Sequence, residues 1–198
     1  MQNVIFIYDN GHGLETPGKR SPDAKLQEAL YTREIASKIV NKLSCFGYTT
    51  HLLVPEEHDV PLAERVRRVN SMVKNHPEVQ YFLISLHVNA AGNGKAWTTA
   101  NGWSVYVCNN CSSLSKELAE IHASNAAQQG LKVRRQYPNL GYWQENYYII
   151  KKTLCPAILT ENLFMDNHQD CDLLLSEEGK DKIANLHVYS VLDFLRYE

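Results

Sequence analysis

Short apolar runs alternate with longer amphipathic segments along the chain. The runs are too short for helices and are rich in β-branched or aromatic residues, so they predict buried strands. They fall at residues 4–8, 48–54, 81–86, 103–107 and 156–160. Apolar residues recur at helical spacing between these runs. The predicted helices span residues 23–47, 62–74 and 112–129, and a last helix begins at residue 176.

This alternation of strands and helices is typical of an α/β fold. We expect a single domain over residues 1–198, a mostly parallel twisted β-sheet flanked by helices on both faces. The helix ends carry capping signals: Asp23 and Ser176 as N-caps, Gly47 and Gly130 as stops. Residues 90–101 and the aromatic residues 131–148 are expected to be irregular.

Composition narrows the function classes. The net charge of the 198 residues is −2, which argues against a nucleic-acid partner, including at the arginine-rich residues 65–68. No run approaches the ~20 apolar residues of a membrane span, and the N-terminus lacks the features of a signal peptide. We therefore expect synthesis in the cytoplasm without a signal peptide, no membrane contact, and a monomer.

The five cysteines do not predict a disulfide framework. Their number is odd and they are scattered along the chain. Cys108 and Cys111 form a single CxxC pair, whereas a structural zinc site needs a second pair. Two ordinary thiols near a strand end are the favoured interpretation of this pair.

Polar residues with catalytic potential follow three of the apolar runs. His12 lies between two glycines after the first run, His87 follows the run at 81–86, and Glu161 follows the run at 156–160. Ligands of open α/β sheets bind at the carboxyl ends of strands, so these side chains are expected to meet at one edge. Glu28 lies seven residues before Ile35 on the apolar face of its helix, where a carboxylate needs a cation, hydrogen bonds or a metal.

His12, Glu28 and His87 supply the two histidines and one carboxylate of a catalytic zinc site, which leaves one position open for water. Cleavage of an amide also needs a group that takes the proton of the water and passes it to the leaving amine. Glu161 is the candidate for that role, and Asp9 with the glycine turn is expected to orient His12.

Each of these residues also has an ordinary structural interpretation. A single histidine after a strand is often only a hydrogen-bonded polar residue. Glu28 could pair with Arg33 or Arg68, and Glu161 could cap the turn that follows it. The zinc hypothesis therefore depends on the four residues occurring together.

Four segments resemble the zinc-dependent N-acetylmuramoyl-L-alanine amidases of the Amidase_3 type. They are residues 9–13 (DNGHG), Glu28 with its helix, residues 85–90 (SLHVNA) and residues 155–162 (CPAILTEN). The resemblance implies Zn²⁺ on His12, Glu28 and His87, with Glu161 as catalytic acid and base. It implies cleavage of the amide between N-acetylmuramic acid and the L-alanine of the peptidoglycan stem peptide.

The chain departs from the family pattern at two places. Leu14 follows the His-Gly pair where the family commonly has glycine. After the last strand the family commonly has Glu-x-Gly-Phe, whereas residues 161–164 of this chain are ENLF. A peptidoglycan hydrolase without an export signal is explained if it is a phage or prophage lysis enzyme that reaches the cell wall after release through a separate pore. Export by a route not written in the sequence is the other explanation.

Aromatic and polar residues near the candidate site could bind sugar rings and stem peptides, although the tyrosines could equally pack a long connection. Arg134 or Arg135 could bind a stem-peptide carboxylate through two hydrogen bonds, or be simply solvated. The candidate substrate-binding residues are Asn89, Arg134, Tyr142, Trp143 and Asn146. Two alternative functions stay open: a zinc carboxypeptidase-like amidohydrolase, and a non-catalytic cell-wall-binding module.

Overall fold

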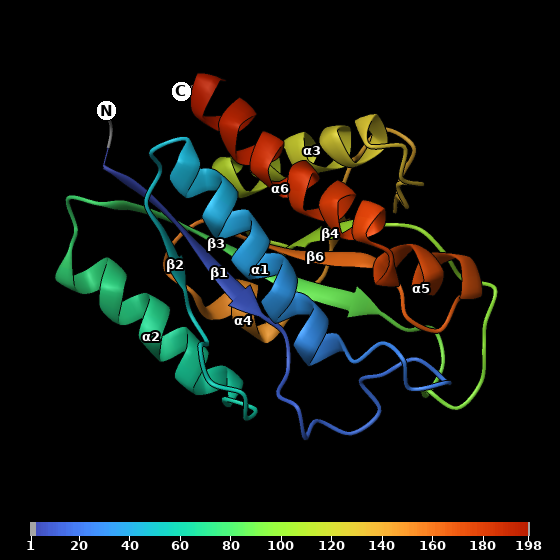
Figure 1. The fold of residues 1–198 in the computed structure, drawn as a ribbon. Coiled ribbons are helices and arrows are strands. Elements are labelled where there is room, and N and C mark those ends of the chain that lie inside the picture. Colours follow the sequence, from blue (N-terminus) through green and yellow to red (C-terminus); the bar gives the residue numbers. More distant parts are fainter. Residues whose placement is uncertain (1–2, 198) are drawn as a thin grey trace.

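A six-stranded sheet with helices on both faces forms the domain in the computed structural model, which describes residues 3–197 (Figure 1). The strands are β1 (Val4–Asn10), β2 (Thr50–Leu52), β3 (Gln80–Asn89), β4 (Ser104–Val107), β5 (Trp143–Gln144) and β6 (Ala157–Phe164). The helices are α1 (Glu28–Cys45), α2 (Leu62–Asn75), α3 (Ser113–Gln128), α4 (Tyr148–Lys152), α5 (His168–Leu175) and α6 (Glu177–Tyr197).

The strand order is β2-β1-β3-β6-β4-β5, and all neighbours are parallel except β4 and β6. The predicted mostly parallel sheet is therefore confirmed. Because β4 runs against β6, Ser104 at the start of β4 lies beside Glu161. The edge that holds the ends of β1, β3 and β6 thus also holds the beginning of β4.

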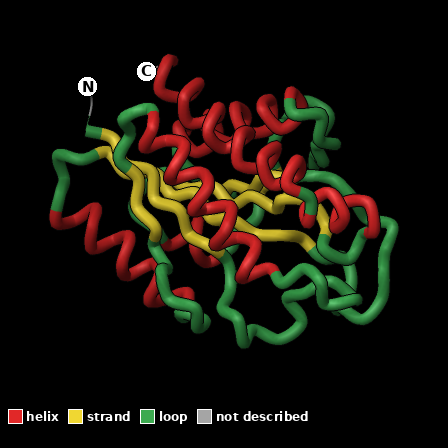
Figure 2. The backbone as a smooth tube through the Cα atoms, viewed as in Figure 1, coloured by secondary structure: helices red, strands yellow, loops and turns green. Residues whose placement is uncertain are grey.

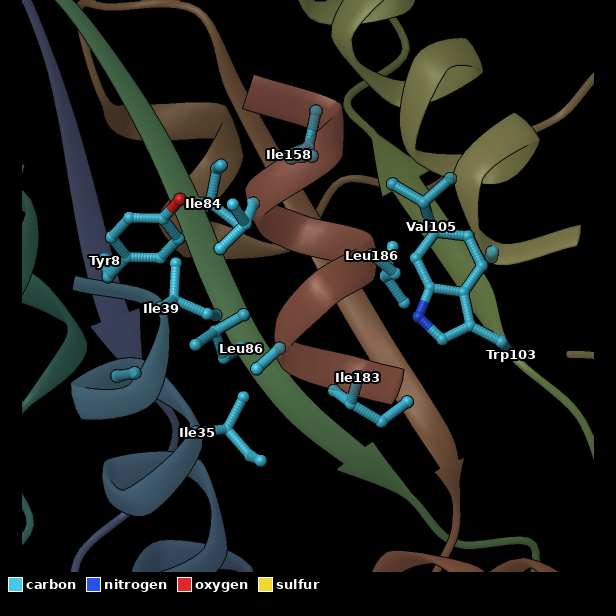
Figure 3. Close-up of a cluster of buried hydrophobic side chains, with 14 of the residues drawn as sticks. Tyr8, Ile35, Ile39, Ile84, Leu86, Trp103, Val105, Ile158, Ile183 and Leu186 are labelled. Carbon is cyan, nitrogen blue, oxygen red and sulfur yellow. The ribbon is translucent and has the colours of Figure 1, made fainter. Parts of the chain in front are cut away.

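Alternating side chains of the strands divide the core between the two faces of the sheet. Ile84 and Leu86 pack with residues of α1, α3 and α6, as Figure 3 shows for Ile35, Ile39 and Ile183. Tyr81 and Leu83 pack on the opposite face with residues of α2 and α4. His87 and Glu161 continue the second series, so they project from the face that α2 and α4 cover.

The first helix begins later than predicted. Asp23 accepts a hydrogen bond from the Ser21 hydroxyl inside a turn, whose Ala24 has a φ of 59°, and α1 begins only at Glu28. The prediction of a helix start at Asp23 was wrong, because a polar turn can satisfy the same capping signal. Ser176 does cap α6, by accepting a hydrogen bond from the Gly179 amide at 3.0 Å.

Several segments were not predicted. The two-residue strand β5 lies in the segment 131–148 that was expected to be irregular, and two short helices, α4 and α5, occur where no element was predicted. β3 and β6 also continue beyond their apolar runs, so His87 and Glu161 lie within strands and face each other in register. None of the helices described in residues 3–197 has the length and apolar character needed to cross a bilayer.

Two loops lie side by side at the edge of the sheet where β1 and β3 end (Figure 2). They are residues 11–27, after β1, and residues 90–103, after β3. A Cβ atom at Gly94 would lie 3.2 Å from the carbonyl oxygen of Gly18, so the two loops approach each other closely here. Asp166 anchors the second loop by accepting hydrogen bonds from the Ala91 and Gly92 amides.

Candidate metal centre

Three potential metal ligands meet at this edge of the sheet. His12 comes from the loop after β1, Glu28 is the first residue of α1, and His87 lies in β3. One ligand atom from each lies within 4.8 Å of the others. Glu28 joins the two histidines: its Oε1 is 3.1 Å from His87 Nδ1, and its Oε2 is 3.6 Å from His12 Nε2.

The glycine turn brings His12 against His87. A Cβ atom at Gly11 would lie 2.5 Å from the His87 ring, and one at Gly13 would overlap the backbone of Asp59. His12 itself has a φ of 61°, in the left-handed region that side chains disfavour. Its carbonyl oxygen accepts hydrogen bonds from both terminal nitrogens of Arg33 at 3.1 Å, which hold this conformation in place.

Glu28 is a buried carboxylate without an arginine partner. Its Oε1 accepts a hydrogen bond from the Val88 amide at 3.0 Å, whereas Oε2 is buried and has no hydrogen-bond partner among residues 3–197. Arg33 donates to backbone carbonyls and Arg68 pairs with other glutamates, so neither satisfies Glu28. A buried anionic oxygen beside two imidazoles fits a divalent cation.

Burial and neighbouring charges set the protonation of the two histidines. Burial lowers the pKa of His12 to about 4, although the charge of Glu28 opposes it. Burial also disfavours the protonated form of His87, but the hydrogen bond and charge of Glu28, with a contribution from Glu161, raise the His87 pKa overall. A metal ion competes with this proton, since histidine binds metals in its neutral form.

Glu161 lies beside these residues but outside the ligand cluster. Its Cα pairs with that of His87 across β3 and β6, and its Oε2 is buried without a hydrogen-bond partner among residues 3–197. Burial raises the pKa of Glu161 to about 7, and the charge of Glu28 adds to this rise while His87 opposes it. A carboxyl group that titrates near neutral pH is suited to both accept and donate a proton.

A buried ion pair supports the histidines from the α2 side. Arg65 donates to Asp9 Oδ1 at 2.8 Å, and the Ser85 hydroxyl donates to the other oxygen of this carboxylate at 2.6 Å. Arg65 also donates to the carbonyl oxygens of Asn10 and His12. Asp9 was expected to orient His12, and here it acts through Arg65, which was not predicted as a site residue. Arg65 directly precedes Val66 on the apolar stripe of α2, and this position was the feature of the sequence that could have identified it as a site residue.

A cavity of about 400 Å³ opens beside the two histidines. The residues that line it include the polar Asp9, Asp59 and Arg65 and the apolar Val60 and Leu62. It lies on the face of the sheet that α2 and α4 cover, the face from which His87 projects. The ligand cluster therefore has open space next to it.

The five candidate substrate-binding residues lie in different places. Arg134 and Trp143 are half-buried beside β4, and the charge of Arg134 contributes to the pKa of Glu161. Tyr142 is 7% exposed and belongs to the hydrophobic core. Asn146 accepts a hydrogen bond from the Asn109 amide beyond the far end of β4, away from Glu161, because β4 is antiparallel to β6. Asn89 accepts one from the Ala90 amide at the end of β3.

This chain is similar in sequence to a known protein family and to several known proteins. A family model, Amidase_3, described as N-acetylmuramoyl-L-alanine amidase, matches residues 5–193. An endolysin of Bacillus phage SPP1 is 24% identical over 98% of this chain and 67% of its own length. The N-acetylmuramoyl-L-alanine amidase CwlM of Bacillus licheniformis is 29% identical over 92% of this chain and 65% of its own length. The chain thus spans about two thirds of the length of these relatives.

Solved structures share the fold. An N-acetylmuramoyl-L-alanine amidase from Clostridium difficile 630 superimposes with a TM-score of 0.84 at 24% identity and covers all of both chains. The catalytic domain of the amidase CwlV from Bacillus (Paenibacillus) polymyxa gives 0.79 at 21% identity, over 98% of this chain and 99% of that one. At these identities the similarity demonstrates a common architecture.

Proposed function

The chain belongs to the Amidase_3 family, and from this premise we propose that it is a zinc-dependent peptidoglycan hydrolase. Its substrate would be the amide bond between N-acetylmuramic acid and the L-alanine of the stem peptide. The observation that carries the proposal is the cluster of His12, Glu28 and His87, whose ligand atoms lie within 4.8 Å of one another, beside the unpaired Glu161.

The donor set fits zinc. Two imidazoles and one carboxylate are a ligand set of catalytic zinc sites. The Oε2 of Glu28 accepts no hydrogen bond within residues 3–197, and the nearest lysine, Lys19, stays at 3.9 Å, so this oxygen is available to an ion. Zn²⁺, when bound, supplies Lewis-acid polarisation of a carbonyl and lowers the pKa of a water molecule. The protein holds the ligands in place through the hydrogen bonds of Arg33 and Arg65 to the carbonyl oxygen of His12.

Glu161 would move the proton. In its ionised form it accepts a proton from the attacking water, whose oxygen forms a bond to the lactyl carbonyl carbon. It then donates this proton to the L-alanine nitrogen as the carbon–nitrogen bond breaks, and so returns to its ionised form. A pKa of about 7 allows both transfers near neutral pH, because neither form is strongly favoured.

The relatives support action on the cell wall, in a lysis or a remodelling role. One is named an endolysin, from a bacteriophage. Another is named N-acetylmuramoyl-L-alanine amidase LytC, of Bacillus subtilis, and is 30% identical over 91% of this chain and 33% of its own length. We propose that the chain acts as a phage or prophage lysis enzyme. A coding gene located away from phage or lysis genes would contradict this part of the proposal.

Product analysis tests the activity. Purified peptidoglycan is digested with the zinc-loaded protein, with and without a chelator, and the fragments are identified by mass spectrometry. The proposal expects a new amino group on L-alanine and an intact muramic acid, and expects the chelator to abolish both. Released terminal amino acids would indicate a carboxypeptidase instead, and binding without cleavage would indicate a non-catalytic wall-binding module.

Glu161→Gln tests the division of roles within the site. This variant is expected to retain zinc at the wild-type stoichiometry and to lose about 10²- to 10⁴-fold in turnover, because only proton transfer is removed. Glu145→Gln, at an exposed glutamate after β5, is the matched control and should keep full activity. An active Glu161→Gln enzyme would contradict the assignment.

A further inference from the structure

Arg134 lies in the irregular segment after α3, and its backbone is fixed on both sides. Its amide donates to the carbonyl of Trp103 at 2.8 Å, and its own carbonyl accepts from the indole nitrogen of Trp143 at 3.1 Å. Trp103 directly precedes β4, and Trp143 begins β5. The segment that carries Arg134 is therefore tied to β4, the neighbour of β6, and to β5 beyond it.

Two aromatic rings hold the guanidinium group of Arg134. Its central carbon lies 4.8 Å from the centre of the Phe164 ring and 5.6 Å from that of Trp143, both within range of cation–π attraction. Phe164 is 2% exposed, so its ring is a fixed support. The plane of the guanidinium is thus restrained before any ligand binds.

No anionic partner is found for this positive charge in the part of the chain that the structure describes. No carboxylate of the described residues 3–197 lies within 4.0 Å of the Arg134 guanidinium. By contrast, Arg65 and Arg68 pair with carboxylates and Arg33 donates to three carbonyl groups. A restrained, half-buried and unpaired guanidinium is suited to bind a carboxylate through two parallel hydrogen bonds.

The order of the strands places this charge relative to the site. His12 follows β1, His87 lies in β3, Glu161 in β6 and Arg134 beside β4, which is the order of these strands in the sheet. Arg134 therefore lies on the Glu161 side of the site. The group that protonates the leaving nitrogen faces the peptide half of the substrate, and this half carries free carboxylates.

We propose that Arg134 binds a carboxylate of the stem peptide and makes the enzyme prefer stem peptides whose second residue has a free α-carboxylate over those in which it is amidated. This inference rests on the proposed function. It assigns Arg134 a role in substrate specificity rather than in the chemical step. Replacement of Arg134 should therefore change the preference between the two substrates.

Two muramoyl peptides test the proposal, identical except that the second residue carries a carboxylate in one and a carboxamide in the other. The wild type is expected to cleave the carboxylate form with the higher kcat/KM. Arg134→Met should lower kcat/KM about 10- to 100-fold on the carboxylate form, the loss expected for a hydrogen bond to a charged group. Arg134→Met should change kcat/KM for the carboxamide form by less than about 3-fold, because this substrate has no charged group for Arg134 to bind.

Two further variants separate binding from structure. Arg67→Met removes an exposed arginine of α2 that pairs with Glu64 and should leave both substrates unaffected. Arg134→Lys keeps the charge but not the fork of donors, so it should recover only part of the discrimination, and it replaces Arg134→Met if that variant does not fold. Thermal unfolding and zinc content of each variant are measured in parallel.

Two different failures are distinguishable. If the wild type does not discriminate between the substrates, or Arg134→Met loses activity equally on both, the carboxylate role of Arg134 is wrong while the amidase function stands. If the zinc-loaded wild type cleaves neither these substrates nor intact peptidoglycan at the muramoyl amide, the proposed function itself fails.

Discussion

At the scale of single residues, a buried ion pair helps to hold this site in place. Arg65 and Asp9 are 2% and 1% exposed, and their ion pair measures 2.8 Å. The Ser85 hydroxyl donates to Asp9, and Arg65 also donates to Asp59 Oδ1 and to the carbonyl oxygens of Val60, Asn10 and His12. Removal of Arg65 leaves the Asp9 carboxylate buried with only the Ser85 hydroxyl as a hydrogen-bond partner among residues 3–197.

Arg65→Met is therefore expected to lower the free energy of unfolding by about 3–5 kcal/mol, the usual cost of breaking a buried ion pair. Arg67→Met, two residues later on α2, removes an exposed arginine that pairs only with Glu64 and should cost less than about 1 kcal/mol. Urea unfolding of the metal-free proteins measures both. Equal losses in the two variants would show that the Asp9 pair contributes no more than a surface contact.

At the scale of secondary-structure elements, the spacing of apolar residues predicts much of the fold but not all of it. β1, β2, β3, β4, β6 and the four long helices follow from the spacing of apolar residues. The strand-end rule selected His12, His87 and Glu161 as neighbours. The spacing of apolar residues does not reveal whether a strand runs parallel or antiparallel to its neighbour, so the antiparallel direction of β4 could not be predicted. This direction places Ser104 beside Glu161, and Arg134 is bonded to Trp103 at the same end of β4. Arg65 was missed because its partner Asp9 is 56 residues away in the chain.

The contact between α3 and α6 contains two buried histidines. His122 and His187 are both fully buried, with ring centres 5.2 Å apart. Burial lowers the pKa of His122 to about 4, and burial together with the charge of His122 lowers that of His187 well below its usual value. In the unfolded chain both bind protons near pH 6.5, so between pH 6.5 and 4 the unfolded state holds more protons and stability falls as the pH falls.

His122→Leu is expected to reduce this acid sensitivity. Between pH 7 and pH 5 the free energy of unfolding of the variant should decrease by ~2 kcal/mol less than that of the wild type, because one proton-binding site of the unfolded chain is gone. His76→Gln, at an exposed histidine after α2, should follow the wild type. Urea unfolding at both pH values in a chelator gives the difference, and identical slopes in all three proteins would contradict the assignment.

At the scale of the whole molecule, the candidate metal centre joins parts that are distant in sequence. The loop after β1, the first turn of α1 and the end of β3 each supply one candidate ligand, and 75 residues separate His12 from His87. The unfolded chain does not hold these groups together, so an ion that binds them stabilises the folded state by RT ln(1 + [L]/Kd). Zinc binding is therefore expected to be visible in global stability, independently of catalysis.

At a free zinc concentration of 100 Kd the stabilisation is about 2.7 kcal/mol, and for a domain of this size Tm should rise by about 5–10 °C. His12→Ala should lose this rise because it removes a ligand, whereas Glu161→Gln should keep it because Glu161 is not one. His76→Ala controls for zinc bound at surface histidines. Differential scanning calorimetry with zinc and with a chelator separates these cases. If the Tm shift is retained in His12→Ala but lost in Glu161→Gln, the two assignments are wrong. The ion would then be bound by Glu161, the carboxylate assigned here to proton transfer, and not by His12.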